Sequence, residues 1–173
     1  MIKHMVFAAL LSVVMGGAAY AQAAKLNDAQ IAHVAYTAGQ IDIAAAKQAI
    51  SKSKNADVIA FANEMASDHA AVNDQALALV AKLKVTPEDN AVSQALTKQA
   101  DAEMKALGAL DGAAFDKAYI ENEVAYHKVV NTALADTLIP SAQNADLKAL
   151  LETGLKLFTS HQQHAEHLAM GVK

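Results

Sequence analysis

The chain has 173 residues, with 14 basic residues, all of them lysine, 18 acidic residues and a formal net charge of −4. A net acidic chain without arginine lacks the guanidinium groups that bind phosphates, so the composition argues against nucleic-acid binding. Cysteine is absent, which excludes disulfides and thiol catalysis.

The first residues have the order of a secretory signal peptide. A charged start at Lys3 precedes an apolar run, and small residues lead to an A-x-A motif at residues 19–21. The run is shorter than the roughly 20 apolar residues that a membrane anchor needs. We therefore predict that residues 1–21 are cleaved and that residues 22–173 form one domain. The protein is then periplasmic or secreted from a bacterium, with no integral membrane segment after cleavage.

The remainder of the chain is rich in residues that favour helix, with only two prolines. Apolar residues recur at three- and four-residue steps, which predicts helices. We expect four long helices at residues 28–51, 56–84, 113–138 and 145–170, and a weakly amphipathic helix at 90–109. Asn27, Asn55 and Asn144 stand at N-cap positions, and Pro140 is expected to stop the third long helix.

Four long amphipathic helices suit an all-α four-helix bundle. The weaker helix at 90–109 would span about 30 Å at 1.5 Å per residue, enough to run from one end of a bundle to the other. We expect it to lie on the outside, as a helical crossover between the second and third long helices of an up-down arrangement.

Four polar residues lie on the apolar stripes of the four long helices: Asp42, His69, His127 and His161. Counted along each helix from the nearest joint, they differ in height by only about 3 to 6 Å. We therefore expect them to meet in one layer. Three imidazoles and a carboxylate are a ligand set for one divalent transition metal ion, and we take these four residues as the candidate metal site.

Two other interpretations remain open. Neutral histidines and carboxylates also form closed hydrogen-bond networks without a metal, through Asp42 or through Glu123, one turn before His127. The protein would then be a structural or envelope-stress bundle. A ferritin-type metal-dependent oxidase is the third interpretation, although the chain has no Glu-x-x-His pair of the di-iron bundles. His164 and His167 are expected to be solvated or rim residues.

Several segments of the chain together resemble the bacterial family called domain of unknown function 4142. The resemblance covers about residues 26–168, and its more specific parts are the Asp-His pair and the Phe-Asp-x-x-Tyr segment followed by His. The residues that carry it are Gly39-Gln40-Ile41-Asp42, Phe61-Ala62, Asp68-His69, Phe115-Asp116, Tyr119, His127, His161, Ala165 and Leu168.

This resemblance implies export and a ferritin-like bundle, because the family is secreted and is usually placed with the ferritin-like proteins. The family's usual residue at position 42 is Glu, and the shorter Asp42 is expected to reach less far toward a shared site. No catalytic residue, protein partner or reaction follows from the sequence. The function it favours is that of an exported, non-enzymatic bundle whose cofactor is one divalent metal ion.

Overall fold

A computed structural model describes residues 26–172, and all regular secondary structure in this part of the chain is helical. The prediction of an all-α chain is therefore confirmed for these residues. The five longer helices are α2 (Asp28–Lys52), α3 (Ala56–Leu83), α4 (Ala91–Gly108), α5 (Gly112–Ala133) and α7 (Ala145–Ala169). The expected signal peptide lies outside the described residues.

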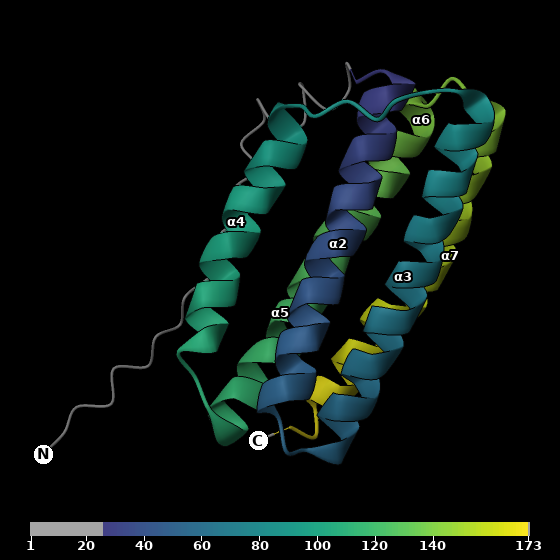
Figure 1. Cartoon of the computed structure of the whole chain (residues 1–173). Coiled ribbons are helices and arrows are strands. Elements are labelled where there is room, and N and C mark those ends of the chain that lie inside the picture. The colour runs from purple at the N-terminus through teal and green to yellow at the C-terminus, as the bar shows by residue number, and fades with distance from the viewer. Residues whose placement is uncertain (1–25, 173) are drawn as a thin grey trace, which may run out of the picture.

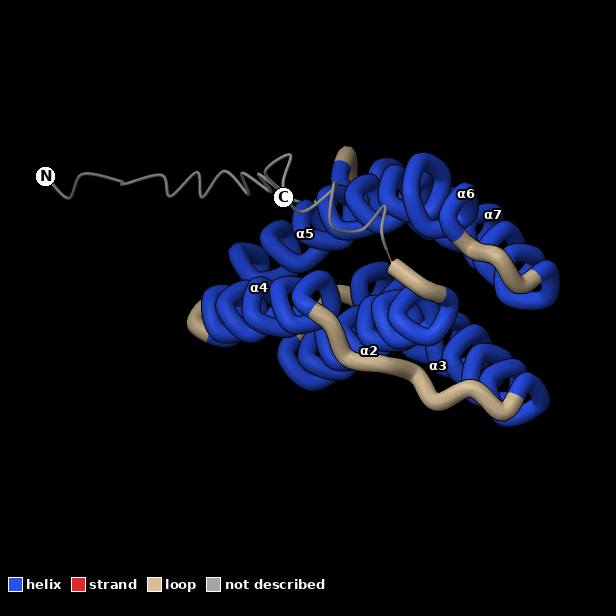
Figure 2. Tube along the Cα trace, turned by 90° about the horizontal axis from the view of Figure 1, so that it is seen from above, coloured by secondary structure: helices blue, strands red, loops and turns tan. Residues whose placement is uncertain are grey.

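The helices follow one another up and down the molecule (Figure 1). The chain descends in α2, returns in α3, descends again in α4, rises in α5 and descends in α7. The most extensive contacts join α2 to α3 and α5 to α7, and Figure 2 shows these pairs as two facing layers. Helix α4 lies at the edge, where it packs mainly against α2 and also against α5.

Asparagine side chains begin four of these helices. Asn27 forms a capping box with Gln30, and Asn55, Asn90 and Asn144 each accept hydrogen bonds from backbone N–H groups in the first turn. Such caps satisfy N–H groups that have no partner within the helix. The three asparagines expected at N-caps therefore occupy those positions.

The expectation that Pro140 stops the third long helix at residue 138 is wrong. Helix α5 is followed without a break by the π-helical turn η1 (Leu134–Leu138) and by α6 (Ile139–Ser141). Pro140 lies in the first turn of α6, where the missing N–H of proline leaves few bonds unmade. The π-helical turn changes the hydrogen-bond register just before the proline, so the helical path continues to Ser141.

Two apolar clusters fill the interior, and a polar layer separates them. One cluster includes Ile31, Leu138, Leu147 and Leu151. The other includes Phe61, Met65, Phe115, Tyr119 and Ile120. Between them lie the buried polar residues Asp42, His69, Asn73, Glu123, His127 and His161. Among the described helices, none is both long and apolar enough to cross a membrane.

Candidate metal centre

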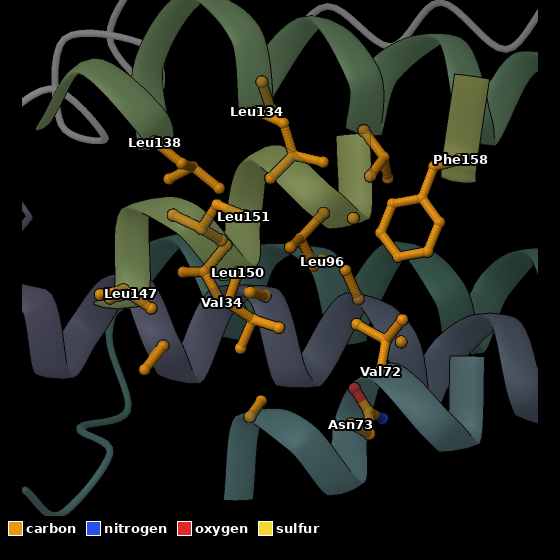
Figure 3. Close-up of a pocket in the computed structure, with 18 of the residues that line it drawn as sticks. Val34, Val72, Asn73, Leu96, Leu134, Leu138, Leu147, Leu150, Leu151 and Phe158 are labelled. Atoms are coloured by element: carbon orange, nitrogen blue, oxygen red, sulfur yellow. The ribbon is translucent and has the colours of Figure 1, made fainter. Parts of the chain in front are cut away.

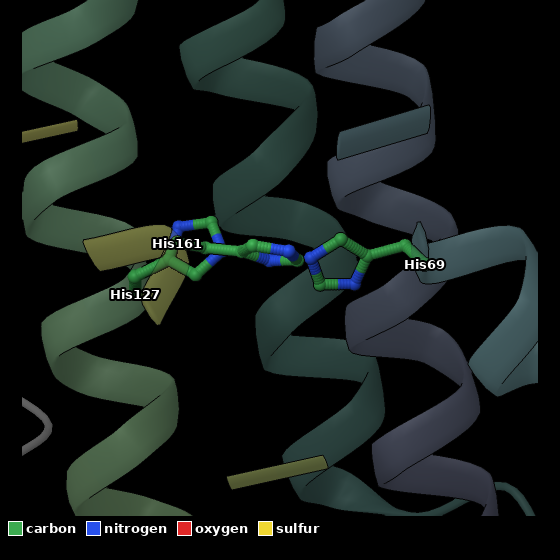
Figure 4. A group of neighbouring side chains, drawn as sticks. All are labelled: His69, His127 and His161. Atoms are coloured by element: carbon green, nitrogen blue, oxygen red, sulfur yellow. The ribbon is translucent and has the colours of Figure 1, made fainter. Parts of the chain in front are cut away.

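The four residues expected to meet do lie together. Nε2 of His69 lies 3.4 Å from Oδ2 of Asp42, and Nε2 of His127 lies 3.6 Å from the same oxygen. His69, His127 and His161 each offer a nitrogen within 4.8 Å of the other two. The three rings converge from α3, α5 and α7 (Figure 4), and each of the four residues is at most 2% exposed.

Glu123 belongs to the same cluster, although the predicted metal ligands did not include it. Its Oε2 lies 3.5 Å from Nδ1 of His127, and ligand atoms of Asp42, Glu123 and His127 lie within 4.8 Å of one another. The sequence did contain an indication of this: Glu123 lies one turn before His127, so the two side chains share a face of the helix. The centre therefore holds two carboxyl groups instead of one.

Ionising both carboxyl groups at once would cost much free energy, because both are fully buried. Burial raises the pKa of Asp42 to about 7, while its interaction with the Glu123 side chain acts in the opposite direction. Burial, and then the nearby Asp42, raise the pKa of Glu123 well above its ordinary range. In the metal-free protein at neutral pH the pair therefore holds at least one proton.

His69 and His127 are held neutral by the same burial. The pKa of His69 falls to about 2, first through burial and then through the proximity of His127 and His161. The pKa of His127 falls to about 4, again chiefly through burial. Neutral imidazole is the form that binds metals.

Several buried ligand atoms lack a hydrogen-bond partner within the described part of the chain. They are both ring nitrogens of His69, Nε2 of His127 and Nδ1 of His161. Unpaired buried polar atoms are costly and uncommon. Two ligands bound at 2.0–2.2 Å to a tetrahedral metal lie about 3.3–3.6 Å apart. The separations of 3.4 and 3.6 Å around Oδ2 of Asp42 fit such an ion.

Two of the histidines have an outer hydrogen-bond partner. His127 Nδ1 lies 3.0 Å from the Glu123 carbonyl oxygen, and His161 Nε2 lies 3.0 Å from Oδ2 of Asp68. Metal-binding histidines commonly donate their second N–H to a carbonyl or carboxylate, which fixes the ring and its tautomer. These contacts leave Nε2 of His127 and Nδ1 of His161 free for a metal, so the residues fit the ion.

Gly39 lets α3 approach α2 closely, one turn before Asp42. A Cβ atom at position 39 would clash with the side-chain amide of Asn73. Asn73 is itself buried and donates from Nδ2 to the Tyr36 carbonyl oxygen at 3.4 Å. Because Asn73 is one turn after His69 on α3, this close approach brings Asp42 within reach of His69 despite its short side chain.

An apolar cavity of about 80 Å³ borders the centre (Figure 3). Its lining includes Val34, Val72, Leu134, Leu151 and Phe158, with Asn73 at its edge. The Phe158 ring stacks on His69 with a centroid separation of 4.5 Å and an interplanar angle of 9°. Phe158 therefore forms the wall between the cavity and the polar cluster.

Comparison with known families agrees with the resemblance noted in the sequence. The family described as domain of unknown function (DUF4142) matches residues 14–168. The chain belongs to this family. No curated protein matches the DUF4142 chain described here.

A solved structure shares the fold of this DUF4142 protein. It is the crystal structure of a DUF305 protein from Streptomyces coelicolor that is predicted to be secreted. The alignment has a TM-score of 0.67 and 16% sequence identity, and it covers 82% of this chain and 90% of the other. At this identity the likeness concerns the fold alone.

Proposed function

We propose that this protein is an exported, non-enzymatic helical bundle that binds one divalent transition metal ion through Asp42, His69, His127 and His161. The carrying observation is the set of buried ligand atoms without hydrogen-bond partners among the described residues, since a bound ion would compensate for their burial. A closed metal-free network is the alternative, but neither ring nitrogen of His69 has a hydrogen-bond partner among the described residues.

The ligand count favours a binding role over catalysis. Structural zinc sites have four protein ligands, whereas catalytic sites keep one position for water or substrate. The three histidines offer nitrogens within 4.8 Å of one another, and Oδ2 of Asp42 lies 3.4 Å and 3.6 Å from Nε2 of His69 and His127, so these groups would supply four ligands. Glu123 lies beside this shell and offers a further carboxylate or a proton acceptor.

We also infer that the bundle is ferritin-like and forms a single domain, with α2, α3, α5 and α7 as its four long helices. Because α4 carries the chain back along the bundle, α3 and α5 run in the same direction (Figure 1). This is the effect of a long crossover between the second and third helices. Export is supported by the A-x-A motif at residues 19–21 and by the DUF305 neighbour predicted to be secreted.

The test is metal content and metal-dependent stability of the untagged protein. Bound metals are measured by elemental analysis, and the melting temperature is followed with Zn(II), Cu(II), Mn(II) and Fe(II). Ligand at 100 times its dissociation constant stabilises a protein by about 2.7 kcal/mol. We expect His69→Ala to abolish this gain and His167→Ala, an exposed change on α7, to retain it. Absence of any gain, or a full gain in His69→Ala, would refute the proposal.

Oxygen consumption with Fe(II) separates the binding role from the oxidase interpretation. A binding protein leaves the rate at that of a metal-only blank. A faster rate that disappears in His69→Ala would replace our proposal by a ferritin-type oxidase.

A further inference from the structure

A second group of ligands lies outside the buried centre, where α3 and α7 meet. Glu64 and Asp68 are one turn apart on α3, and His161 and His164 are one turn apart on α7. The four side chains pair across the helix boundary. His161 Nε2 lies 3.0 Å from Oδ2 of Asp68, and His164 Nδ1 lies 2.9 Å from Oε2 of Glu64.

The two pairs converge. Glu64, Asp68 and His161 each present a ligand atom, and all three atoms lie within 4.8 Å of one another. Isolated surface ion pairs contribute only about 0–1 kcal/mol, so stability alone gives no reason for this convergence. Two carboxylates and an imidazole from facing helices are ligands for a divalent cation.

The group differs from the buried centre in its access to water. The Asp68 side chain is 35% exposed, and those of Glu64 and His164 are each 42% exposed. His161 is 1% exposed and anchors the group in the wall of the bundle. An ion in solution can therefore reach these carboxylates without opening the helices.

We propose that Glu64, Asp68 and His161 form a second, solvent-facing site for a divalent transition metal, with His164 positioning Glu64. The hydrogen bond from His164 limits the rotation of the long Glu64 side chain and turns it toward Asp68. Water completes the coordination of the ion, because this site has three protein ligands instead of four.

His161 links this outer site to the buried centre. Its Nε2 faces Asp68, and its Nδ1 is buried without a hydrogen-bond partner among the described residues. Its ring centroid lies 5.4 Å from that of His69 and 5.5 Å from that of His127. With both ions bound, the ring loses its remaining proton to solvent and bridges them as an imidazolate. This bridging rests on the proposed inner site, whereas the outer site does not require it.

The test is the zinc stoichiometry of the full protein and of single variants, measured by equilibrium dialysis and elemental analysis. We expect two equivalents for the unaltered protein, one for Glu64→Gln and one for His69→Ala. His161→Ala, which removes the shared ligand, should bind less than one. The control His167→Ala should keep two. His164→Gln should retain the inner ion and weaken the outer one about 10- to 100-fold, as loss of an orienting partner does.

The outcomes separate the two proposals. One equivalent in the unaltered protein, unchanged in Glu64→Gln and lost in His69→Ala, would overturn the outer site and leave the inner one. One equivalent that is lost in Glu64→Gln and kept in His69→Ala would overturn the inner site and leave the outer one. Melting curves of each metal-free variant show whether an altered stoichiometry reflects lost folding; Glu64 and His164 are exposed enough for their variants to fold.

Discussion

Oδ2 of Asp42 on α2 lies 3.4 Å from Nε2 of His69 on α3, too far for a strong hydrogen bond and close enough for one ion to bind both. The two residues come from neighbouring helices, and neither side chain is exposed by more than 3%. The side chain of Asp42 therefore reaches His69 and His127, although it is one methylene shorter than a Glu side chain.

Replacing Asp42 with Asn should lower metal affinity by at least about 100-fold, more than the 10- to 100-fold typical of outer partners. The amide keeps the size of the side chain but removes the charge that offsets the ion. Competition with a chromophoric chelator measures the change. Asp116→Asn is a matched control, because Asp116 is a buried acid outside the cluster. Equal affinities for the two variants would exclude Asp42 as a ligand.

The metal-free protein should lose stability as pH rises above about 6.5. The pKa of Asp42 is raised from 3.8 to about 7. Its contribution to the stability of the folded protein is therefore fully present below pH 3.8 and is lost as the pH rises to about 7. The lowered pKa values of His69 and His127 act in the opposite direction. The stability that these neutral histidines contribute to the folded protein is fully present above pH 6.5 and is lost as the pH falls. Between pH 4 and 6.5 the contributions of the carboxyl groups and of the histidines to the pH dependence roughly cancel. Above pH 6.5 only the carboxyl groups still change the stability with pH.

Urea unfolding in the presence of a chelator, from pH 4.5 to 8.5, measures this dependence. We expect a plateau followed by a decline of about 1–3 kcal/mol per pH unit just above 6.5, since each proton contributes about 1.4 kcal/mol per unit. In Asp42→Asn the decline should be shallower. A stability that rises from pH 6.5 to 8 in the unaltered protein would contradict the assigned protonation of the carboxyl pair.

Gly39→Ala should destabilise the protein by about 1–3 kcal/mol, the usual cost of overpacking. The added Cβ meets the Asn73 amide, so α2 and α3 must separate or Asn73 must move. Chemical denaturation gives the loss, and metal titration shows whether Asp42 still reaches His69. Asn73→Ala in the same chain should recover part of the loss, because it removes the clashing atoms. Additive losses in the double variant would show that the clash is not the cause.

Phe158→Ala should cost about 3–5 kcal/mol and should weaken metal binding about 10-fold. The truncation leaves a cavity and removes the ring that stacks on His69, so the imidazole gains freedom that binding must restrict. Leu151→Ala is the control, because Leu151 lines the same cavity. It should destabilise the fold and leave the metal affinity unchanged. Similar losses of metal affinity in both variants would show that the Phe158 effect comes from lower global stability and not from the contact with His69.

Local sequence patterns were sufficient to predict the helices and the height of the polar layer along the bundle. Asparagine caps and apolar spacing act within a few residues, so the ends of α2 and α3 agree with expectation to within one residue. The expectation for Pro140 was wrong because the apolar spacing did not reveal the π-helical turn before it, which carries the helix past the proline and packs against α7.

Family membership was also visible in the sequence, in the Asp-His pair and the Phe-Asp-x-x-Tyr segment, and the match over residues 14–168 confirms it. The sequence could place four polar residues at one height because helical rise is fixed at 1.5 Å per residue. It could not show which atoms meet, since that depends on the rotation and separation of helices that are distant along the chain.

Tertiary structure alone decided that Gly39 and Asn73 bring α2 against α3, that Glu123 joins Asp42, and that Asp68 faces the outer nitrogen of His161. Each of these contacts crosses between helices or depends on a side-chain rotamer set by its neighbours. Helical periodicity describes positions along one helix axis, whereas the distance between a carboxylate and an imidazole depends on how two different helices pack. The packing of the helices therefore determines which of the polar groups can share one ion.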